Sequence, residues 1–215
     1  MSSLELMLSF IKNELLGEAL PENIEYDVEK LIGLSKSHNL SHLVADALIR
    51  NGIVTSDNKK YKEILREKLI AAYRDTQRTS FYEKVSIILN QNGISYVPMK
   101  GIIISPLYPE SWMRTSCDLD ILVHKEDLKR ASDIFIVNGF IPAKIMNHHD
   151  ISLFQDKNHL ELHFSICENN EQLDKLLKDV WDYTDKVGEY AFRENNEYFA
   201  FHHIAHMASH FLRGG

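Results

Sequence analysis

Two aspartates stand two residues apart in the segment Asp118-Leu119-Asp120, which an apolar run ending at Val123 follows directly. If this segment is a strand, both carboxylates project from one face, because successive side chains of a strand alternate. Leu119, Ile121 and Val123 then point the other way, into a core. Neighbouring carboxylates repel each other unless a cation lies between them, and hard oxygen ligands suit Mg²⁺ bound to substrate phosphates. The spacing therefore indicates a metal–phosphate site and phosphoryl-group chemistry, although aspartates in turns also bond their own backbone at this spacing.

Basic and flexible residues precede this pair. Lys100 and Gly101 fall at a predicted strand-to-helix turn, where glycine lets the backbone approach a ligand and a helix N-terminus offers N–H groups to a phosphate. Arg114, four residues before Asp118, can grip phosphate oxygens with two hydrogen bonds. The structural alternatives are an ordinary connecting turn with a solvated lysine, and a surface arginine paired with an aspartate.

A third carboxylate lies downstream. Apolar residues at 160, 162 and 164 alternate with Glu161 and His163, a pattern that predicts a half-buried strand. If this strand neighbours the first, the carboxylates of Asp118, Asp120 and Glu161 converge at one point. The alternative is a solvent-facing acid on the wet face of an antiparallel sheet.

Taken together, Lys100-Gly101, Arg114, Asp118-Leu119-Asp120 and Glu161-Leu162-His163 resemble the nucleotidyltransferase superfamily that includes DNA polymerase beta. Within it they are similar to the bacterial branch of uncharacterised nucleotidyltransferases. The resemblance covers roughly residues 80–170. The chain departs from the superfamily's usual Gly-Gly or Gly-Ser turn, because it has Lys100-Gly101-Ile102 there.

This resemblance implies a Mg²⁺-dependent enzyme that moves an NMP group from an NTP, such as ATP, to a hydroxyl-bearing small molecule or protein. It implies Asp118, Asp120 and Glu161 as catalytic residues and as ligands of one or two Mg²⁺ ions, with Mn²⁺ as a substitute, and Glu161 also as the base. It implies that nucleotide phosphates bind at three residues, namely Lys100, Gly101 and Arg114. His163 shares a face with Glu161, so it is a candidate to orient that carboxylate or to touch the substrate.

Two other functions stay open. The domain could be a non-catalytic nucleotide-binding or regulatory module, with helices in residues 2–92 docking a protein partner, because this helical region is larger than a catalytic core needs. It could also be a metal-dependent phosphohydrolase, in which water attacks and phosphate is released. The net charge of −7 and the pI of about 5.9 argue against binding of duplex nucleic acid.

The elements that must position these residues form an α+β fold. Residues 1–92 are predicted to be a helical N-terminal region, 93–168 a nucleotidyltransferase-like core with a mixed β-sheet, and 169–215 a C-terminal helical segment. Helices are predicted at 2–16, 27–50 with a break near 37–39, 58–92, 101–108, 125–138, 169–183 and 196–212, and strands at 95–98, 118–123, 140–146, 151–155 and 160–166. Asn39 or Ser41 is expected to cap the helix after the break, and Asn51-Gly52 to end it.

The composition and the cysteine content of the chain indicate where the protein is located. Of its 215 residues, 44% are hydrophobic, which is enough for a substantial core. Cys117 and Cys167 form no disulfide framework, the N-terminus lacks a signal-peptide pattern, and no apolar run approaches the length needed to span a bilayer. We therefore expect a cytoplasmic protein with no membrane partner.

Histidine is plentiful, with eleven residues. His202, His206 and His210 recur every four residues beside His203, and such a helical stripe could hold Zn²⁺. The chain has no His-Glu-x-x-His pattern there and no nearby cysteine, which favours histidines at the edge of a core; a place near the substrate is a further alternative. The pair at 148–149 is expected to lie in a solvated turn.

Overall fold

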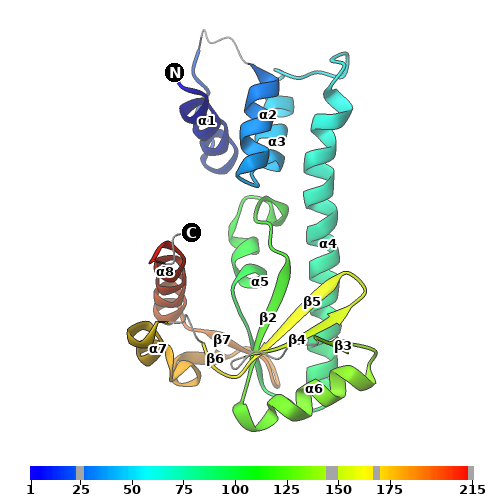
Figure 1. Cartoon of the computed structure of the whole chain (residues 1–215), viewed down its shortest axis with the longest axis vertical. Coiled ribbons are helices and arrows are strands. Elements are labelled where there is room, and N and C mark those ends of the chain that lie inside the picture. The colour runs from blue at the N-terminus through cyan, green and yellow to red at the C-terminus, as the bar shows by residue number, and fades with distance from the viewer. Residues whose placement is uncertain (23–26, 144–149, 167–169, 213–215) are drawn as a thin grey trace. The chain divides into compact units, whose positions relative to one another are not determined.

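The computed structural model describes residues 1–22, 27–143, 150–166 and 170–212 (Figure 1). The chain forms two compact units. The first unit comprises Met1–Gln77 and Ser105–Thr115, and the second comprises Arg78–Ile104 and Ser116–Gly215. The 31-residue helix α4 (Tyr61–Gln91) contributes residues to both. The division at 92/93 and 168/169 drawn from the sequence stays a prediction.

The first unit is helical, as the sequence predicts. Besides the start of α4 it contains α1 (Ser3–Leu16), α2 (Val28–Ser37), α3 (Ser41–Arg50) and the short 3₁₀ helices η1 (Ser105–Leu107) and η2 (Ser111–Met113). A capping box starts α1, because the Ser2 hydroxyl accepts from the Glu5 N–H while the Glu5 carboxylate accepts from the Ser2 N–H. Phe10, which is 0% exposed, lies in the core that these helices share.

The break between α2 and α3 is confirmed, but its predicted cap is wrong. Asn39 adopts a left-handed conformation with φ +56°, which asparagine tolerates better than most residues and which ends α2. Leu40 is the N-cap of α3 and makes no side-chain cap hydrogen bond. The Ser41 hydroxyl is instead engaged by α4, where it donates to Glu67 Oε2 at 2.7 Å. Asn51 is the C-cap of α3 and Gly52 comes next with φ +70°, as expected.

The second unit contains a mixed sheet, which confirms the predicted α+β class. Its strand order is β1-β2-β5-β4-β3. The strands are β1 (Tyr96–Pro98), β2 (Asp118–Val123), β3 (Ile141–Pro142), β4 (Asp150–Gln155) and β5 (Asn158–His163). Strands β2 and β5 are parallel, and the other neighbours are antiparallel. Residues 144–146 of the third predicted strand lie outside the described residues.

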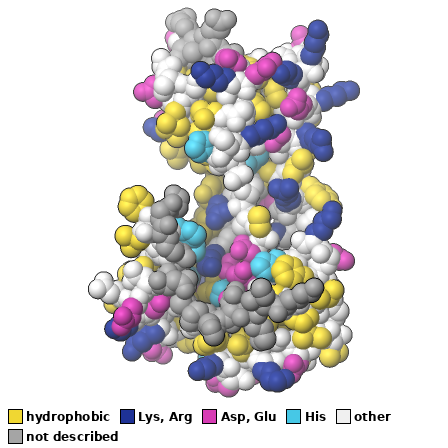
Figure 2. Space-filling view, viewed as in Figure 1, with side chains coloured by type: hydrophobic (Ala, Val, Ile, Leu, Met, Phe, Trp, Pro, Cys, Tyr) yellow, Lys and Arg dark blue, Asp and Glu magenta, His cyan; other side chains and the backbone are white. Residues whose placement is uncertain are grey.

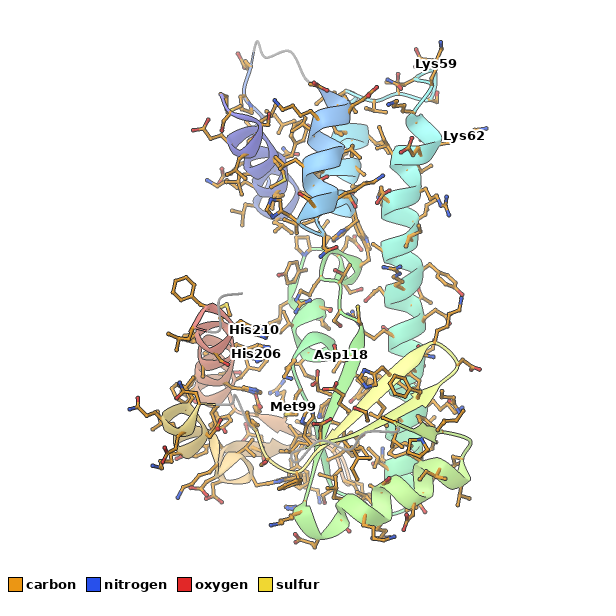
Figure 3. The ribbon with its side chains drawn as sticks, viewed as in Figure 1. Lys59, Lys62, Met99, Asp118, His206 and His210 are labelled. Atoms are coloured by element: carbon orange, nitrogen blue, oxygen red, sulfur yellow. The ribbon has the colours of Figure 1, made fainter. Side chains whose placement is uncertain are left out.

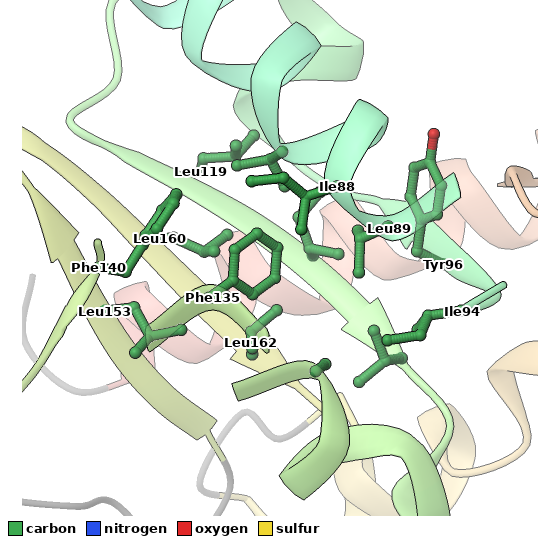
Figure 4. Close-up of a cluster of buried hydrophobic side chains, with 14 of the residues drawn as sticks. Ile88, Leu89, Ile94, Tyr96, Leu119, Phe135, Phe140, Leu153, Leu160 and Leu162 are labelled. Atoms are coloured by element: carbon green, nitrogen blue, oxygen red, sulfur yellow. The ribbon is translucent and has the colours of Figure 1, made fainter. Parts of the chain in front are cut away.

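One face of the sheet packs against α4 and α6 (Leu128–Val137). Figure 4 shows Leu119 of β2 and Leu160 and Leu162 of β5 in this core, with Phe135 of α6 and Leu89 of α4 among them. Ile121 and Val123 belong to the same core and are each 0% exposed. The predicted inward face of β2 is therefore confirmed, and Asp118 and Asp120 alternate with it on the opposite face.

That opposite face is partly covered by the C-terminal elements. They are α7 (Glu171–Leu177), the 3₁₀ helix η4 (Val180–Tyr183), the hairpin β6 (Thr184–Lys186) and β7 (Phe192–Glu194), and α8 (Asn196–Leu212). Val97 and Leu122 from the sheet pack with Val180, Tyr198 and Ala205 from this layer. The hairpin was not predicted from the sequence. Within the described residues, no helix combines the length and the apolar character that crossing a membrane requires.

Candidate active site

The register between β2 and β5 sets the geometry of the acidic residues. Asp118 pairs with His159, Asp120 with Glu161, and Leu122 with His163. Because the two strands are parallel and paired residues project to the same side, Asp120 and Glu161 are neighbours across the strands. Two carboxylates from separate segments of the chain thus meet, as the alternation in both strands predicts.

Two basic side chains hold the Asp120 carboxylate. Asp120 is only 3% exposed, and its Oδ1 lies 2.8 Å from Lys100 Nζ and 3.1 Å from His163 Nε2. His163 Nε2 also lies 3.4 Å from Glu161 Oε2, so this imidazole bridges the two carboxylates. Figure 2 shows acidic side chains, histidine and a basic side chain next to one another on this part of the second unit.

The charges of these groups stabilise one another. Burial alone would raise the pKa of Asp120, but the hydrogen bond from His163 and the charge of Lys100 outweigh it and lower that pKa to about 2. Burial alone would lower the pKa of His163, but its bonds to Asp120 and Glu161 raise it to about 9. The hydrogen bond from His163 also lowers the pKa of Glu161. Around neutral pH, the site therefore contains ionised carboxylates facing a protonated imidazole and an ammonium.

Lys100 reaches Asp120 from a turn with unusual backbone geometry. Its φ is +51°, in the left-handed region that most residues avoid. The Lys100 carbonyl accepts hydrogen bonds from the N–H groups of Ile103 and Ile104, which starts the short helix α5 (Gly101–Ile104). The Met99 N–H donates to the Asp120 carbonyl at 3.0 Å and ties the turn to β2. The predicted strand-to-helix turn is confirmed, with α5 ending at Ile104 and a 3₁₀ helix coming after it.

Gly101 has a packing reason to be glycine. A Cβ atom there would lie 2.5 Å from the Ser116 hydroxyl oxygen and 3.0 Å from Ser116 Cβ. Arg78 of α4, itself only 9% exposed, donates from Nη1 to that hydroxyl at 2.7 Å. The arginine, the serine and the glycine thus join the segment before Asp118 to the turn that carries Lys100. The sequence reasoning missed Arg78 and Ser116, because nothing marks a single arginine in a long charged helix as buried.

Asp118 and Arg114 are placed differently from the residues above. Asp118 is half-buried on β2 and carries a label in Figure 3. Its negative charge helps to raise the pKa of Lys100, after the larger effects of Asp120 and Glu161 and against the opposing effect of burial. Arg114 lies in the first unit at the end of η2, where its guanidinium contacts the Thr115 carbonyl oxygen. Its predicted contact with phosphate stays a prediction.

The two ionised carboxylates offer donor atoms that fit a divalent cation, whereas His163 would have to lose its proton before it could bind a metal. One ligand atom from each of Asp120, Glu161 and His163 lies within 4.8 Å of the others. Carboxylate oxygens suit Mg²⁺ and Mn²⁺, and imidazole suits transition metals better than Mg²⁺. Asp118 is not in this set, although it projects from the same face of β2. The residues at 148–149 and Cys167 fall outside the described residues.

Comparison with known proteins gives one family. The sequence pattern of a family described as uncharacterised nucleotidyltransferase matches residues 25–215 of the chain. A similar solved chain is the antibiotic-resistance factor ANT(2'')-Ia, with a TM-score of 0.37 and 14% sequence identity. The similarity covers 42% of this chain and 48% of that chain, so this chain matches about half the length of that protein. None of the curated proteins compared with the chain matches it.

Proposed function

Because the chain belongs to the family of uncharacterised nucleotidyltransferases, we propose that it transfers an NMP group from an NTP, such as ATP, to a hydroxyl group. The acceptor is a small molecule or a protein side chain, and pyrophosphate is released. The observation that carries this proposal is the pairing of Asp120 with Glu161 across parallel strands, with Lys100 and His163 as counter-charges.

The carboxylates would hold the metal. We assign Asp118, Asp120 and Glu161 as ligands of one or two Mg²⁺ ions, which Mn²⁺ could replace. Bound there, the metal would supply positive charge against the phosphate oxygens at the reacting phosphorus. The low pKa of Asp120 supports this role, because a metal ligand must be deprotonated at working pH.

The chain's own groups perform the remaining tasks. Glu161 accepts the proton of the acceptor hydroxyl, whose oxygen forms a bond to the α-phosphorus as the bond to the β-phosphate oxygen breaks. His163 holds the Glu161 carboxylate in place through its contact at 3.4 Å. Lys100 and the backbone at Gly101 neutralise the triphosphate and the leaving pyrophosphate. We place Lys100 among these groups because its ammonium already lies beside the carboxylates.

Binding of nucleotide tests the site directly. Calorimetry with ATP, GTP, CTP and UTP in the presence of Mg²⁺ is expected to give binding of at least one of them. Asp118→Asn, at a half-buried residue, should weaken that binding by at least roughly tenfold, because a metal ligand is lost. The matched control is Asp133→Asn, which removes an exposed carboxylate on α6 and should leave binding unchanged.

Other outcomes of these measurements would count against the proposed function or favour one of its two alternatives. Silence with all four nucleotides would favour the regulatory module, and unchanged affinity in Asp118→Asn would remove that residue from the site. Incubation of each NTP with candidate acceptors, followed by mass spectrometry, identifies the product. If the reaction releases free phosphate, and forms neither pyrophosphate nor an NMP adduct, the protein is a phosphohydrolase.

A further inference from the structure

The histidines of α8 do not act as the single stripe that their spacing suggests. His202 is 0% exposed, whereas His210 is exposed and its ring packs edge-on against that of His206 at 4.6 Å between centroids. Figure 3 shows His206 and His210 on the side of α8 that faces β2 in this view. The structure instead gathers His202 with its neighbour His203 and with Glu194, the last residue of β7.

We propose that Nε2 of His202 and Nε2 of His203 bind one divalent transition-metal ion, with Glu194 as the carboxylate that orients His202, and that Zn²⁺ fits this site best. One ligand atom from each of the three residues lies within 4.8 Å of the others. A tetrahedral Zn²⁺ with ligands at about 2.0–2.1 Å needs them closer, so small side-chain rotations would close the site. Imidazole nitrogens are ligands that suit zinc and suit Mg²⁺ poorly. This proposal does not depend on the proposed function.

The second observation is a pair of imidazole nitrogens without partners. Within the part of the chain that the structure describes, Nε2 of His202 and Nε2 of His203 are both buried and make no hydrogen bond. A buried polar atom without a partner is uncommon in folded proteins and calls for an explanation such as a bound ion. Here two such atoms lie on adjacent residues whose ring centroids are 5.2 Å apart.

The remaining ring nitrogens are held as they are in metal-binding histidines. His202 Nδ1 lies 2.8 Å from Glu194 Oε1, and Glu194 is itself only 4% exposed. His203 Nδ1 lies 2.7 Å from the Phe199 carbonyl oxygen, so it donates its proton there. A carboxylate or carbonyl at one ring nitrogen fixes the tautomer and leaves the lone pair of the other nitrogen for a metal.

The element boundary explains how these residues meet. Glu194 ends the hairpin β6–β7, and Asn195 caps α8 by accepting from the Tyr198 N–H at 2.9 Å. His202 and His203 lie within the next turns of the helix, and Tyr198 and Ala205 on the same helix pack against the sheet. An ion at this place would join the hairpin to α8, which predicts that it stabilises the second unit.

Zinc binding to the full chain tests the proposal. The variant Glu161→Gln serves as the parent protein, because it weakens the other metal-binding set and leaves Glu194 unchanged. Metal analysis after dialysis against Zn²⁺ with excess Mg²⁺ should find one Zn²⁺ per chain, and the thermal midpoint should rise with Zn²⁺. Replacing Zn²⁺ by Co²⁺ should give the strong visible absorption of a tetrahedral cobalt site.

Variants then locate the ion. In the Glu161→Gln parent, His203→Asn should weaken Zn²⁺ binding at least roughly tenfold and abolish the cobalt absorption. The matched control His210→Asn changes an exposed histidine of the same helix and should retain both. His203 is only partly buried, so its variant remains testable if Glu194→Gln or His202→Asn fails to fold. A parent that retains no zinc, or a His203→Asn variant that binds like the control, would overturn the proposal.

Discussion

At the scale of single residues, Asp120 serves both the chemistry and the stability of the second unit. Its carboxylate is nearly enclosed and accepts from Lys100 and His163 at the same oxygen. Removing one member of a buried charged group leaves the others without compensation, which costs more than the group contributes as a whole. Asp118, half-buried two residues earlier, is not enclosed in this way, so the two aspartates should respond differently to the same substitution.

The comparison of Asp120→Asn with Asp118→Asn makes this difference measurable. Asp120→Asn is expected to lower the free energy of unfolding by about 3 kcal/mol, since it leaves the partly buried cations of Lys100 and His163 facing a neutral amide. Asp118→Asn should change it by no more than about 0.5 kcal/mol. Urea denaturation of both variants at neutral pH and without metal checks the prediction. Equal stabilities would show that Asp120 is not held by its two cations in solution.

At the scale of elements, the features that the sequence predicted are those that alternation and capping determine locally. The inward face of β2, the carboxylate on β5 and the turn at Lys100 all come from patterns within a few residues. The hairpin β6–β7 was missed because its short strands, Thr184–Lys186 and Phe192–Glu194, consist mostly of charged residues and show no apolar alternation. Arg78 was missed for another reason, because its burial depends on Ser116, 38 residues away in the chain. The set of Glu194 with His202 and His203 likewise joins two elements that no local pattern connects.

The packing of α1 against α3 brings a pH dependence to the first unit. Glu14 of α1 is only 4% exposed, and burial, together with the neighbouring Asp46 carboxyl, raises its pKa to about 7 from its ordinary value of 4.5. Arg50 Nη2 of α3 lies 3.2 Å from Glu14 Oε2 and opposes this shift. Because the folded protein binds this proton more tightly than the unfolded chain, its contribution is complete below pH 4.5 and is lost as the pH rises through about 7.

Glu14→Gln should therefore make the stability of the protein depend less on pH between 4.5 and about 7. In the wild-type protein the stability contributed by this group falls between pH 4.5 and pH 7, whereas the variant has no proton to lose there. Denaturation midpoints measured across that interval test this, with Glu18→Gln as the control because that carboxylate is about half exposed. A variant with the same slope as the wild-type protein would place the titration elsewhere.

At the scale of the whole molecule, each of the two units is built from two separate stretches of the sequence. The segment Ser105–Thr115 belongs to the first unit, although it lies between two elements of the second. Trp112 and Met113 of this segment pack with Leu43 and Ala71, and His42 Nε2 lies 3.0 Å from the Met113 carbonyl oxygen. A prediction that divides the chain into consecutive domains cannot assign this segment to the first unit, because the first unit is made of two separate stretches of sequence.

The two tryptophans of the chain fall one in each unit and can report on them separately. Trp112 lies in the first unit, and Trp181 of the second stacks on His124 at 3.7 Å between centroids. Phe10→Ala, in the core of the first unit, should cost about 3–5 kcal/mol. In a Trp181→Phe background, the unfolding transition that Trp112 fluorescence reports should therefore move to a lower denaturant concentration. In a Trp112→Phe background the transition of Trp181 should stay in place; an equal shift there would mean that both units unfold as one.

The parallel pairing of β2 with β5 limits how this protein can change. Substitution at a strand position alters one side chain, but inserting or deleting a single residue within β5 would turn every later side chain to the other side of the sheet. The carboxylate at 161 would then point into the hydrophobic core, and a leucine would project from the face of the sheet that carries Asp120. An engineer who wishes to relocate this acid along its strand can therefore move it only in steps of two residues.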